Sequence, residues 1–337
     1  MPLFAELLQG LADVFTLAVL LAILAGVAIS QFVGALPGIG PVMVMAVAIP
    51  YTLAFDPIVG ISFLLGAMKG GTIGGAIPAI LFNTPGTPDT AMTTLDGYPM
   101  AQNGKAKKAL RMAVFSSVTG DTFSDIVLIT VSAPLALIAL RMGPVEIFSL
   151  MVLAFAVIAG LSGKSIGKAI SAAGLGLLLA TVGLDPEDGT PRLYFGVFEL
   201  FDGIPKVPLA IGVLVMAEVL HRLTQVGTAD PPAVDLNASN DPADHQLTFA
   251  EYWACRYIMF RGAIIGTLIG ALPGIGSTAA ATLSYTTARE AAKDHSGFGK
   301  GDIRGLAAVE SANSAVAGSN LIPLLSLGIP GSVTAAL

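Results

Sequence analysis

The chain has 337 residues, of which 54% are hydrophobic and 12% are charged, and its mean hydropathy is +0.79. Soluble domains carry about 25% charged residues, so this composition excludes an ordinary soluble fold and predicts an all-α polytopic membrane protein. The net charge of −6 argues against a nucleic-acid partner. Cys255 is the only cysteine, which excludes a disulfide within the chain and argues against a cysteine-based metal site.

The N-terminal region is a long uncharged stretch, with no charged residue from Val14 to Phe55. As a single helix, these 42 residues would measure about 63 Å, twice the hydrocarbon core of about 30 Å. More than one membrane segment is therefore expected here. The early charges are acidic (Glu6 and Asp13) and no basic residue precedes them, so we expect an uncleaved membrane segment and not a secretory signal.

Apolar segments alternate with short polar connections along the chain, and one longer polar stretch interrupts them. We expect membrane segments at about 14–34, 41–55, 57–82, 112–139, 145–161, 165–183, 206–221, 257–272, 277–288 and 305–327. The sequence from Leu223 to Ala250 is rich in Asp, Asn, Ala and Pro and is typical of a solvated loop. This predicts a first transmembrane repeat over 1–222, an inter-repeat loop over 223–255 and a second repeat over 256–337.

A seven-residue word, Gly-Ala-Leu-Pro-Gly-Ile-Gly, occurs at Gly34–Gly40 and again at Gly270–Gly276. Proline and glycine break helices, and a break inside lipid is tolerated only where the freed backbone meets protein, water or a ligand. A second pair of motifs repeats with the same internal spacing, Pro78 with Pro85-Gly86 and Pro323 with Pro330-Gly331. Matched breaks in two halves indicate the binding site of a transporter.

The number of predicted segments sets the relative orientation of the two repeats. Seven segments precede the second copy, so it would enter the membrane from the opposite side, which makes an inverted repeat. Three basic loops, around Lys105–Arg111, Lys164–Lys168 and Arg289–Arg304, would then share one side, as the positive-inside rule requires. The second repeat stops at Leu337, shortly after its Pro-Gly motif, so we expect a truncated form of a longer protein.

The repeated breaks are the first candidate binding elements. A helix that restarts after such a break presents unpaired N–H groups and the positive end of its dipole, which suits a carboxylate. The alternative is close helix packing or a simple kink. A second cluster of hydroxyl, amide and backbone groups follows Pro78 and has a partner near the C-terminus; its alternative is an ordinary exit loop. The candidate substrate-binding residues are Pro37, Gly38, Gly40, Asn83, Thr84, Pro85, Gly86, Thr87, Pro273, Gly274, Gly276, Pro330, Gly331 and Ser332.

Ionisable and polar residues within apolar segments form a third candidate set. Charges at such positions are costly and usually face a cavity or a partner. Lys69 is a candidate for neutralising a bound carboxylate, and Asp121 and Asp125 lie four apart on one helix face. The alternative is a structural Lys–Asp pairing or an interfacial location. The candidates for ion coupling or charge pairing are Lys69, Asp121, Asp125, Glu310, Asn313 and Ser314.

With these motifs together, the chain resembles the large membrane subunit of the tripartite tricarboxylate transporters (TctA-like) over essentially its whole length. One position departs from the family pattern, because Ser314 stands where the family has a second amide after Asn313. The resemblance rests on Gly34–Gly40, Pro78–Pro88 with its Asn-Thr-Pro-Gly-Thr-Pro word, Asp96-Gly97-Tyr98-Pro99, Gly270–Gly276 and Glu310–Gly331.

The resemblance implies a subunit of a secondary carrier in the bacterial inner membrane. Its partners would be a small membrane subunit and a periplasmic solute-binding protein that delivers citrate or a related di- or tricarboxylate. A gradient of Na⁺ or H⁺ would drive import, with no ATP and no bound cofactor. A carboxylate-permeable channel and a scaffold that docks the receptor are the alternatives. An enzyme is not expected, because no nucleophile–base set is recognisable.

Overall fold

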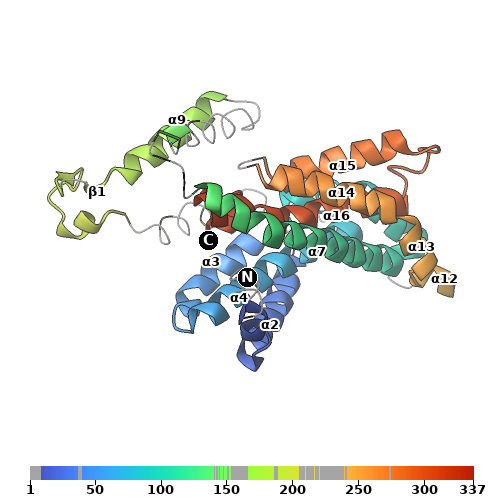
Figure 1. Cartoon of the computed structure of the whole chain (residues 1–337). Helices are drawn as coiled ribbons and strands as arrows, with labels where there is room; N and C mark the ends of the chain where they lie inside the picture. Colours follow the sequence, from blue (N-terminus) through green and yellow to red (C-terminus); the bar gives the residue numbers. More distant parts are fainter. Residues whose placement is uncertain are drawn as a thin grey trace.

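The computed structural model describes residues 9–36, 40–139, 166–185, 189–204, 241–272 and 275–337, with isolated positions between 141 and 239. The described chain is almost wholly helical (Figure 1), which confirms the predicted all-α class. Within the described residues, three helical stretches are long and apolar enough to cross a membrane: Leu17–Gly34, Pro57–Phe82 and Thr94–Ser132. The predicted segments at 145–161 and 206–221 lie almost entirely outside the described residues.

The first unit of the fold consists of four helices separated by breaks. Proline stands at the first position of α3 and of α4, where its missing N–H costs nothing. Asp56 caps α4 by accepting a hydrogen bond from the Ile58 N–H at 3.0 Å. The four helices are α2 (Leu17–Gly34), α3 (Pro41–Thr52), α4 (Pro57–Gly74) and α5 (Ala76–Phe82).

The middle of the chain contains the longest helix, α7 (Ala106–Ala139), which Lys105 precedes directly. Its 34 residues would measure about 51 Å, more than a hydrocarbon core needs. The other elements of this region are η1 (Pro88–Thr90), α6 (Thr94–Met100), the π-helical turn η2 (Ala101–Lys105), α9 (Ile166–Ala180), the antiparallel strands β1 (Gly183–Leu184) and β2 (Pro191–Arg192), and η3 (Phe198–Asp202).

The second unit begins within the sequence that was expected to be loop. Residues 242–254 form two short helices, so the end of the predicted inter-repeat loop is ordered as helix; Thr248 and Glu251 cap the second of them reciprocally. The helices are α12 (Pro242–His245), α13 (Phe249–Ala254), α14 (Arg256–Gly270), α15 (Ser277–Ala291), α16 (Ile303–Ser319), α17 (Leu321–Leu327) and α18 (Val333–Ala336).

The two units share their element order and their backbone hydrogen bonds. Helices α2, α3, α4 and α5 correspond to α14, α15, α16 and α17, and the seven-residue word separates the first two in each unit. In the turn that ends each unit, the Gly86 N–H donates to the Gly75 carbonyl at 3.3 Å, and the Gly331 N–H donates to the Asn320 carbonyl at 3.2 Å. The repeated sequence therefore forms a repeated local fold.

Small residues allow the first and third helices of each unit to pack closely. A methyl group added at Gly26 of α2 would overlap the backbone of Phe63 in α4. One added at Gly266 of α14 would overlap the carbonyl of Ala312 in α16. Membrane helices approach through small residues in this way, because lipid supplies no hydrophobic force to drive them together.

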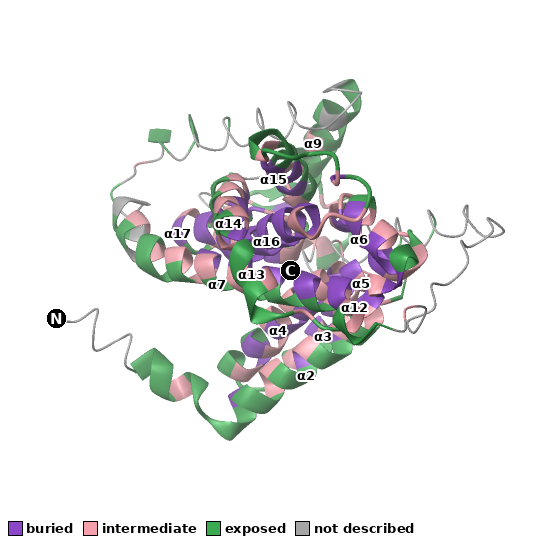
Figure 2. Ribbon diagram, turned by 90° about the vertical axis from the view of Figure 1, so that its right-hand side faces the viewer, coloured by how far each residue is buried: buried purple, intermediate pink, exposed green. Residues whose placement is uncertain are grey.

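Helix α16 lies at the centre of the second unit, and its residues from Gly305 to Ser319 are all buried (Figure 2). Helices α7, α14 and α15 pack around it. The C-terminal helix α18 reaches α3 of the first unit, so the end of the chain lies beside that helix (Figure 1). Helix α16 also contacts α4 of the first unit, so part of its surface lies between the two units.

Candidate functional site

A cavity of about 340 Å³ lies where the two units meet. Both units line it, each through the start of the helix that follows its seven-residue word. Its walls are Pro41, Val42, Met68, Thr72, Pro88, Asp89, Gly276, Ser277, Asn313, Val316, Ala317, Asn320, Gly331, Ser332, Val333 and Thr334.

A larger groove of about 820 Å³ lies along α2, α3 and α4, but its walls are almost wholly apolar. Leu21, Ile29, Val47 and Phe63 are typical of its lining. Among the described residues no charged side chain lines it, so it offers little that would recognise a carboxylate. The smaller cavity is therefore the better candidate for a polar ligand, because specificity comes from a few well-placed polar groups.

The N-terminal ends of α3 and α15 both reach the 340 Å³ cavity, through Pro41 and Val42 and through Gly276 and Ser277. Such ends carry unpaired N–H groups and a partial positive charge. No Lys, Arg or His of the described part of the chain lines this cavity. Gly276 has φ +79°, a conformation that side chains disfavour. The remaining break residues Pro37, Gly38, Pro273 and Gly274 lie outside the described residues.

Buried amide groups in the cavity wall lack protein partners. Neither the oxygen nor the nitrogen of the Asn313 amide has a hydrogen-bond partner among the described residues, although the side chain is 1% exposed. Asn320 donates through Nδ2 to Ser332 Oγ at 2.7 Å, and its Oδ1 has no partner there. An unsatisfied buried polar group costs about 1–3 kcal/mol. The two amide oxygens can coordinate a cation or accept a hydrogen bond, and the Asn313 nitrogen can donate a hydrogen bond to an anion.

The turn from Asn83 to Thr87 does not line the cavity. Its polar groups stabilise the turn itself: Asn83 has φ +51°, and the Thr84 hydroxyl donates to the carbonyl of Phe82 at 3.0 Å. Thr87 caps η1, and its methyl carbon would lie 3.0 Å from a methyl group added at Gly40. Of the predicted substrate-binding residues that the structure describes, only Gly276, Gly331 and Ser332 line the cavity; Gly40, Asn83, Thr84, Pro85, Gly86, Thr87 and Pro330 do not.

Asp89 and Asn320 belong to the two polar clusters that the sequence indicated, Asn83–Thr90 and Asn313–Ser332, whereas Ser277 was not a candidate. Asp89 accepts a hydrogen bond from the Thr278 hydroxyl at 3.0 Å, which joins η1 to α15 of the second unit. Ser277 directly follows the second break, and Asn320 occupies the position in its unit that Gly75 has in the other. A comparison of the two repeats could have singled out Asn320, because a polar residue replaces a glycine there.

Lys69 of α4 forms a compact ion-pair cluster with two aspartates of α7. Its Nζ lies 2.6 Å from Asp121 Oδ1 and 2.7 Å from Asp125 Oδ2. Asp121 and Asp125 are one turn apart and face the same lysine, as their spacing predicts. The cluster carries a formal charge of −1 and lies outside the cavity wall. This geometry matches the structural Lys–Asp pairing that was given as an alternative to a functional role for these residues.

Glu310 of α16 is fully buried between α6 and α7. The Thr93 hydroxyl donates to its Oε1 at 2.5 Å, and the Ser117 hydroxyl donates to its Oε2 at 3.2 Å. Within the described residues no lysine or arginine pairs with Glu310. Ser314, one turn further along, is also buried and has no partner for its Oγ there. Neither residue lines the cavity.

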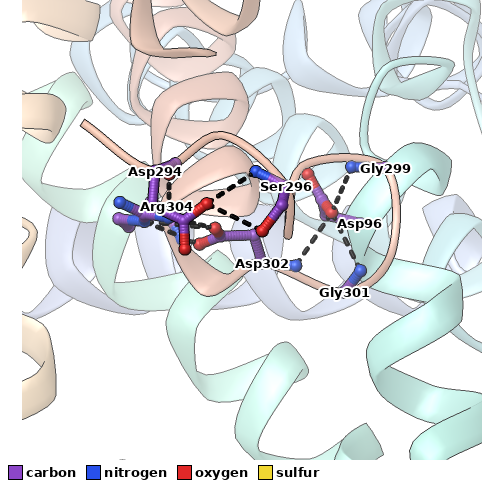
Figure 3. Close-up of polar contacts among 7 residues, drawn as sticks. All are labelled: Asp96, Asp294, Ser296, Gly299, Gly301, Asp302 and Arg304. Carbon is purple, nitrogen blue, oxygen red and sulfur yellow. Dashed lines mark hydrogen bonds and ion pairs between the residues drawn. The ribbon is translucent and has the colours of Figure 1, made fainter. Parts of the chain in front are cut away.

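Asp96, at the start of the Asp-Gly-Tyr-Pro motif, connects α6 to the loop between α15 and α16 (Figure 3). Its Oδ1 accepts hydrogen bonds from the N–H groups of Gly299, Gly301 and Asp302 at 2.8–2.9 Å. In the same loop, Arg304 forms an ion pair with Asp302 at 2.5 Å. The loop of the second unit is thus fixed to α6 through one carboxylate.

Membrane-length apolar helices, two similar units and a polar cavity between them define a polytopic membrane protein. Within that class, the chain belongs to the tripartite tricarboxylate transporter TctA family, whose sequence profile matches residues 20–337. This confirms the resemblance that the motifs indicated. The family is a component of membrane transporters and is not a family of enzymes.

Two proteins of Agrobacterium vitis are similar to the chain. One, described as "Uncharacterized 52.8 kDa protein in TAR-I ttuC' 3'region", is 36% identical over 337 residues, which are 100% of this chain and 66% of that protein. The other, "Uncharacterized protein in TAR-II ttuC' 3'region", is 46% identical over 72 residues, 21% of this chain and 30% of that protein. The chain thus spans just under two thirds of the first relative's length. No solved structure matches it.

Proposed function

We propose that this chain is part of the membrane subunit of a secondary carrier, which imports a tricarboxylate or a related carboxylate through the 340 Å³ cavity. The observation that carries the proposal is the meeting of the two repeated units at this cavity. Each unit contributes a helix start, and α16 contributes the unpartnered amides of Asn313 and Asn320. The family membership supports transport as the activity.

The two units would be inverted relative to each other and would expose the cavity to each side in turn. In support, α14 and α15 have 15 residues each, or about 22 Å, which is short for a full crossing of about 30 Å. Helices of this length suit broken or re-entrant segments that end near the bilayer middle. A ligand drives such an exchange only if it binds the two states differently, so the cavity must change shape as the units move.

The chemistry of the cavity wall suits an anion together with a cation. Helix starts at Pro41 and Ser277 would receive carboxylate groups through backbone N–H donors. The Asp89 carboxylate and the Asn320 oxygen would instead favour a cation, so a coupling Na⁺ or H⁺ is expected to bind on that side. Lys69, Asp121, Asp125 and Glu310 would then balance charge around the moving helices, without direct contact with the substrate.

The complete transporter would lie in the bacterial inner membrane. A small membrane subunit would accompany the full-length protein, and a periplasmic solute-binding protein would deliver the carboxylate. Family membership supports these partners, because tripartite transporters have three components by name.

The test is receptor-dependent citrate uptake into proteoliposomes that hold the full-length protein with its small subunit. Asn313→Ala and Asn320→Ala each remove an amide from the cavity wall. Hydrogen bonds to charged groups are worth about 1.5–3 kcal/mol, so each variant should raise the half-saturation concentration about 10- to 100-fold. Asn103→Ala removes an exposed amide far from the cavity and should leave uptake unchanged.

Normal uptake by both cavity variants would contradict the proposal. Uptake that never saturates would favour a channel. If proteoliposomes that hold only the two membrane subunits show no uptake when the receptor is supplied, the chain would act as a docking scaffold instead.

A further inference from the structure

Helix α13 presents a cluster of exposed aromatic side chains on one face. Phe249 and Trp253 are stacked with ring centroids 5.8 Å apart. The Arg256 guanidinium lies over the rings of Trp253 and Tyr257, at 5.3 and 4.3 Å from their centroids. Phe249 is 74% exposed and Tyr257 is 73% exposed, so these rings contribute little to the core of the described chain.

Other side chains of α13 fix the helix to the first half of α7. Glu251 forms an ion pair with Lys108 at 2.7 Å. The Tyr252 and Thr119 hydroxyls share a hydrogen bond of 2.7 Å. Because these polar contacts fix the rotation of the helix, the aromatic face is held outward and does not arise from a loosely attached segment.

The exposed face continues from α13 along α14 and changes in character. After Tyr257, the exposed residues on this side are Phe260, Ile264 and Leu268, three or four positions apart. Trp253, Tyr257 and Arg256 are therefore at one end of a stripe that becomes aliphatic further along. Tryptophan and tyrosine prefer the level of the lipid headgroups, and aliphatic side chains prefer the acyl chains.

We infer that this stripe faces lipid, that the aromatic end of α13 lies at the headgroup level, and that Arg256 there binds the phosphate of an anionic phospholipid. Arg256 suits this role because its charge makes no ion pair among the described residues, and the two rings beneath it hold the guanidinium in place. Arginine on an aromatic platform binds phosphate oxygens through paired N–H donors. Such a contact would set the depth of α14, and hence of the break that follows it.

The chain offers a direct probe, because Trp253 is its only tryptophan. The protein is placed in bilayers containing phospholipids with bromines high, midway or deep along the acyl chain, and the quenching of Trp253 fluorescence is measured. Quenching should be strongest for the high bromines, and iodide in the water should quench weakly. Phe32→Trp in a Trp253→Phe background serves as a control, because Phe32 is 75% exposed on an apolar helix and should be quenched by bromines and not by iodide.

The lipid preference is tested with brominated phosphatidylglycerol against brominated phosphatidylcholine. The anionic lipid should be enriched about fivefold near Trp253, the equivalent of about 1 kcal/mol per arginine at an anionic surface. Arg256→Gln should abolish this enrichment, whereas Lys293→Gln, in an exposed loop between α15 and α16, should not change it.

Two results would overturn the inference. Full quenching by iodide with none by bromines would place the rings in water. Protection from both quenchers would mean that a protein covers the aromatic face.

Discussion

The Asp96 carboxylate provides a quantitative test of how the second unit is joined to α6. Asp96 is 1% exposed, and its Oδ1 accepts three backbone N–H groups from the loop before α16 (Figure 3). Replacing it with alanine would leave the N–H groups of Gly299, Gly301 and Asp302 without their acceptor. The loop would then lose its attachment to α6, although the loop itself would remain intact.

The magnitude follows from the number and kind of hydrogen bonds. Each bond to a charged acceptor is worth about 1.5–3 kcal/mol, but the contributions do not add fully. The loop is partly exposed, so water can reach some of the released donors. We expect Asp96→Ala to lower the free energy of unfolding by about 3 kcal/mol. Asp96→Asn, which keeps an acceptor oxygen and loses the charge, should lower it by about half as much.

The assay is equilibrium unfolding of the purified protein in mixed micelles, followed by helical circular dichroism. Asp294→Asn is the matched control, because Asp294 is an exposed acceptor in the same loop whose partner is the nearby Ser296; its unfolding curve should match that of the unmodified protein. A loss below about 1 kcal/mol for Asp96→Ala would refute the reasoning, since it would mean that the three donors are as stable without the carboxylate.

Three further predictions concern packing and charge. Gly266→Ala should destabilise the protein by about 1–3 kcal/mol in the same assay, because the methyl group would overlap the neighbouring backbone, whereas Gly174→Ala, in open space on α9, should not destabilise it. Lys69→Met should cost about 3 kcal/mol, since it leaves two carboxylates unpaired, and changing both of its aspartate partners to asparagine as well should recover most of that loss. Burial raises the pKa of Glu251, but hydrogen bonds from Lys108 and Thr248 outweigh it and hold the pKa below its ordinary value of 4.5. The attachment of α13 is therefore fully present above pH 4.5 and is lost as the pH falls through the lowered pKa of Glu251. The emission of Trp253 should follow this loss, and Glu251→Gln should remove the pH dependence.

Much of the site was predictable because the duplication is written in the sequence. The seven-residue word that begins at Gly34 and again at Gly270 located both breaks. In each copy, the helix that follows the word directly has its start in the cavity wall. Helical spacing alone placed Asp121 and Asp125 on one face. Their shared partner Lys69 is 52 positions from Asp121. The ion pairing of Lys69 with these aspartates was therefore only one of several possibilities until the packing of α4 on α7 was known.

Other features depended wholly on tertiary packing. The sequence pointed to the turn from Asn83 to Thr87 as binding residues, yet Thr84 and Thr87 bond within the turn and its neighbour η1, and the cavity wall contains Asp89, Asn313 and Asn320 instead. A cluster of polar residues has the same appearance in a sequence whether it caps a turn or faces a ligand. Only the direction of each side chain separates the two cases.

By itself, the sequence determined that this protein lies in a lipid bilayer, that it is helical, that it contains a duplication, and to which family it belongs. Lipid demands an apolar composition and internally bonded backbone, and both requirements are visible residue by residue. The tertiary structure alone decided which polar groups meet, because residues about 200 positions apart, such as Asp96 and Gly301, come together only through the angles and depths at which helices pack. Those angles depend on many small side-chain contacts at once, and no local pattern in the chain encodes them.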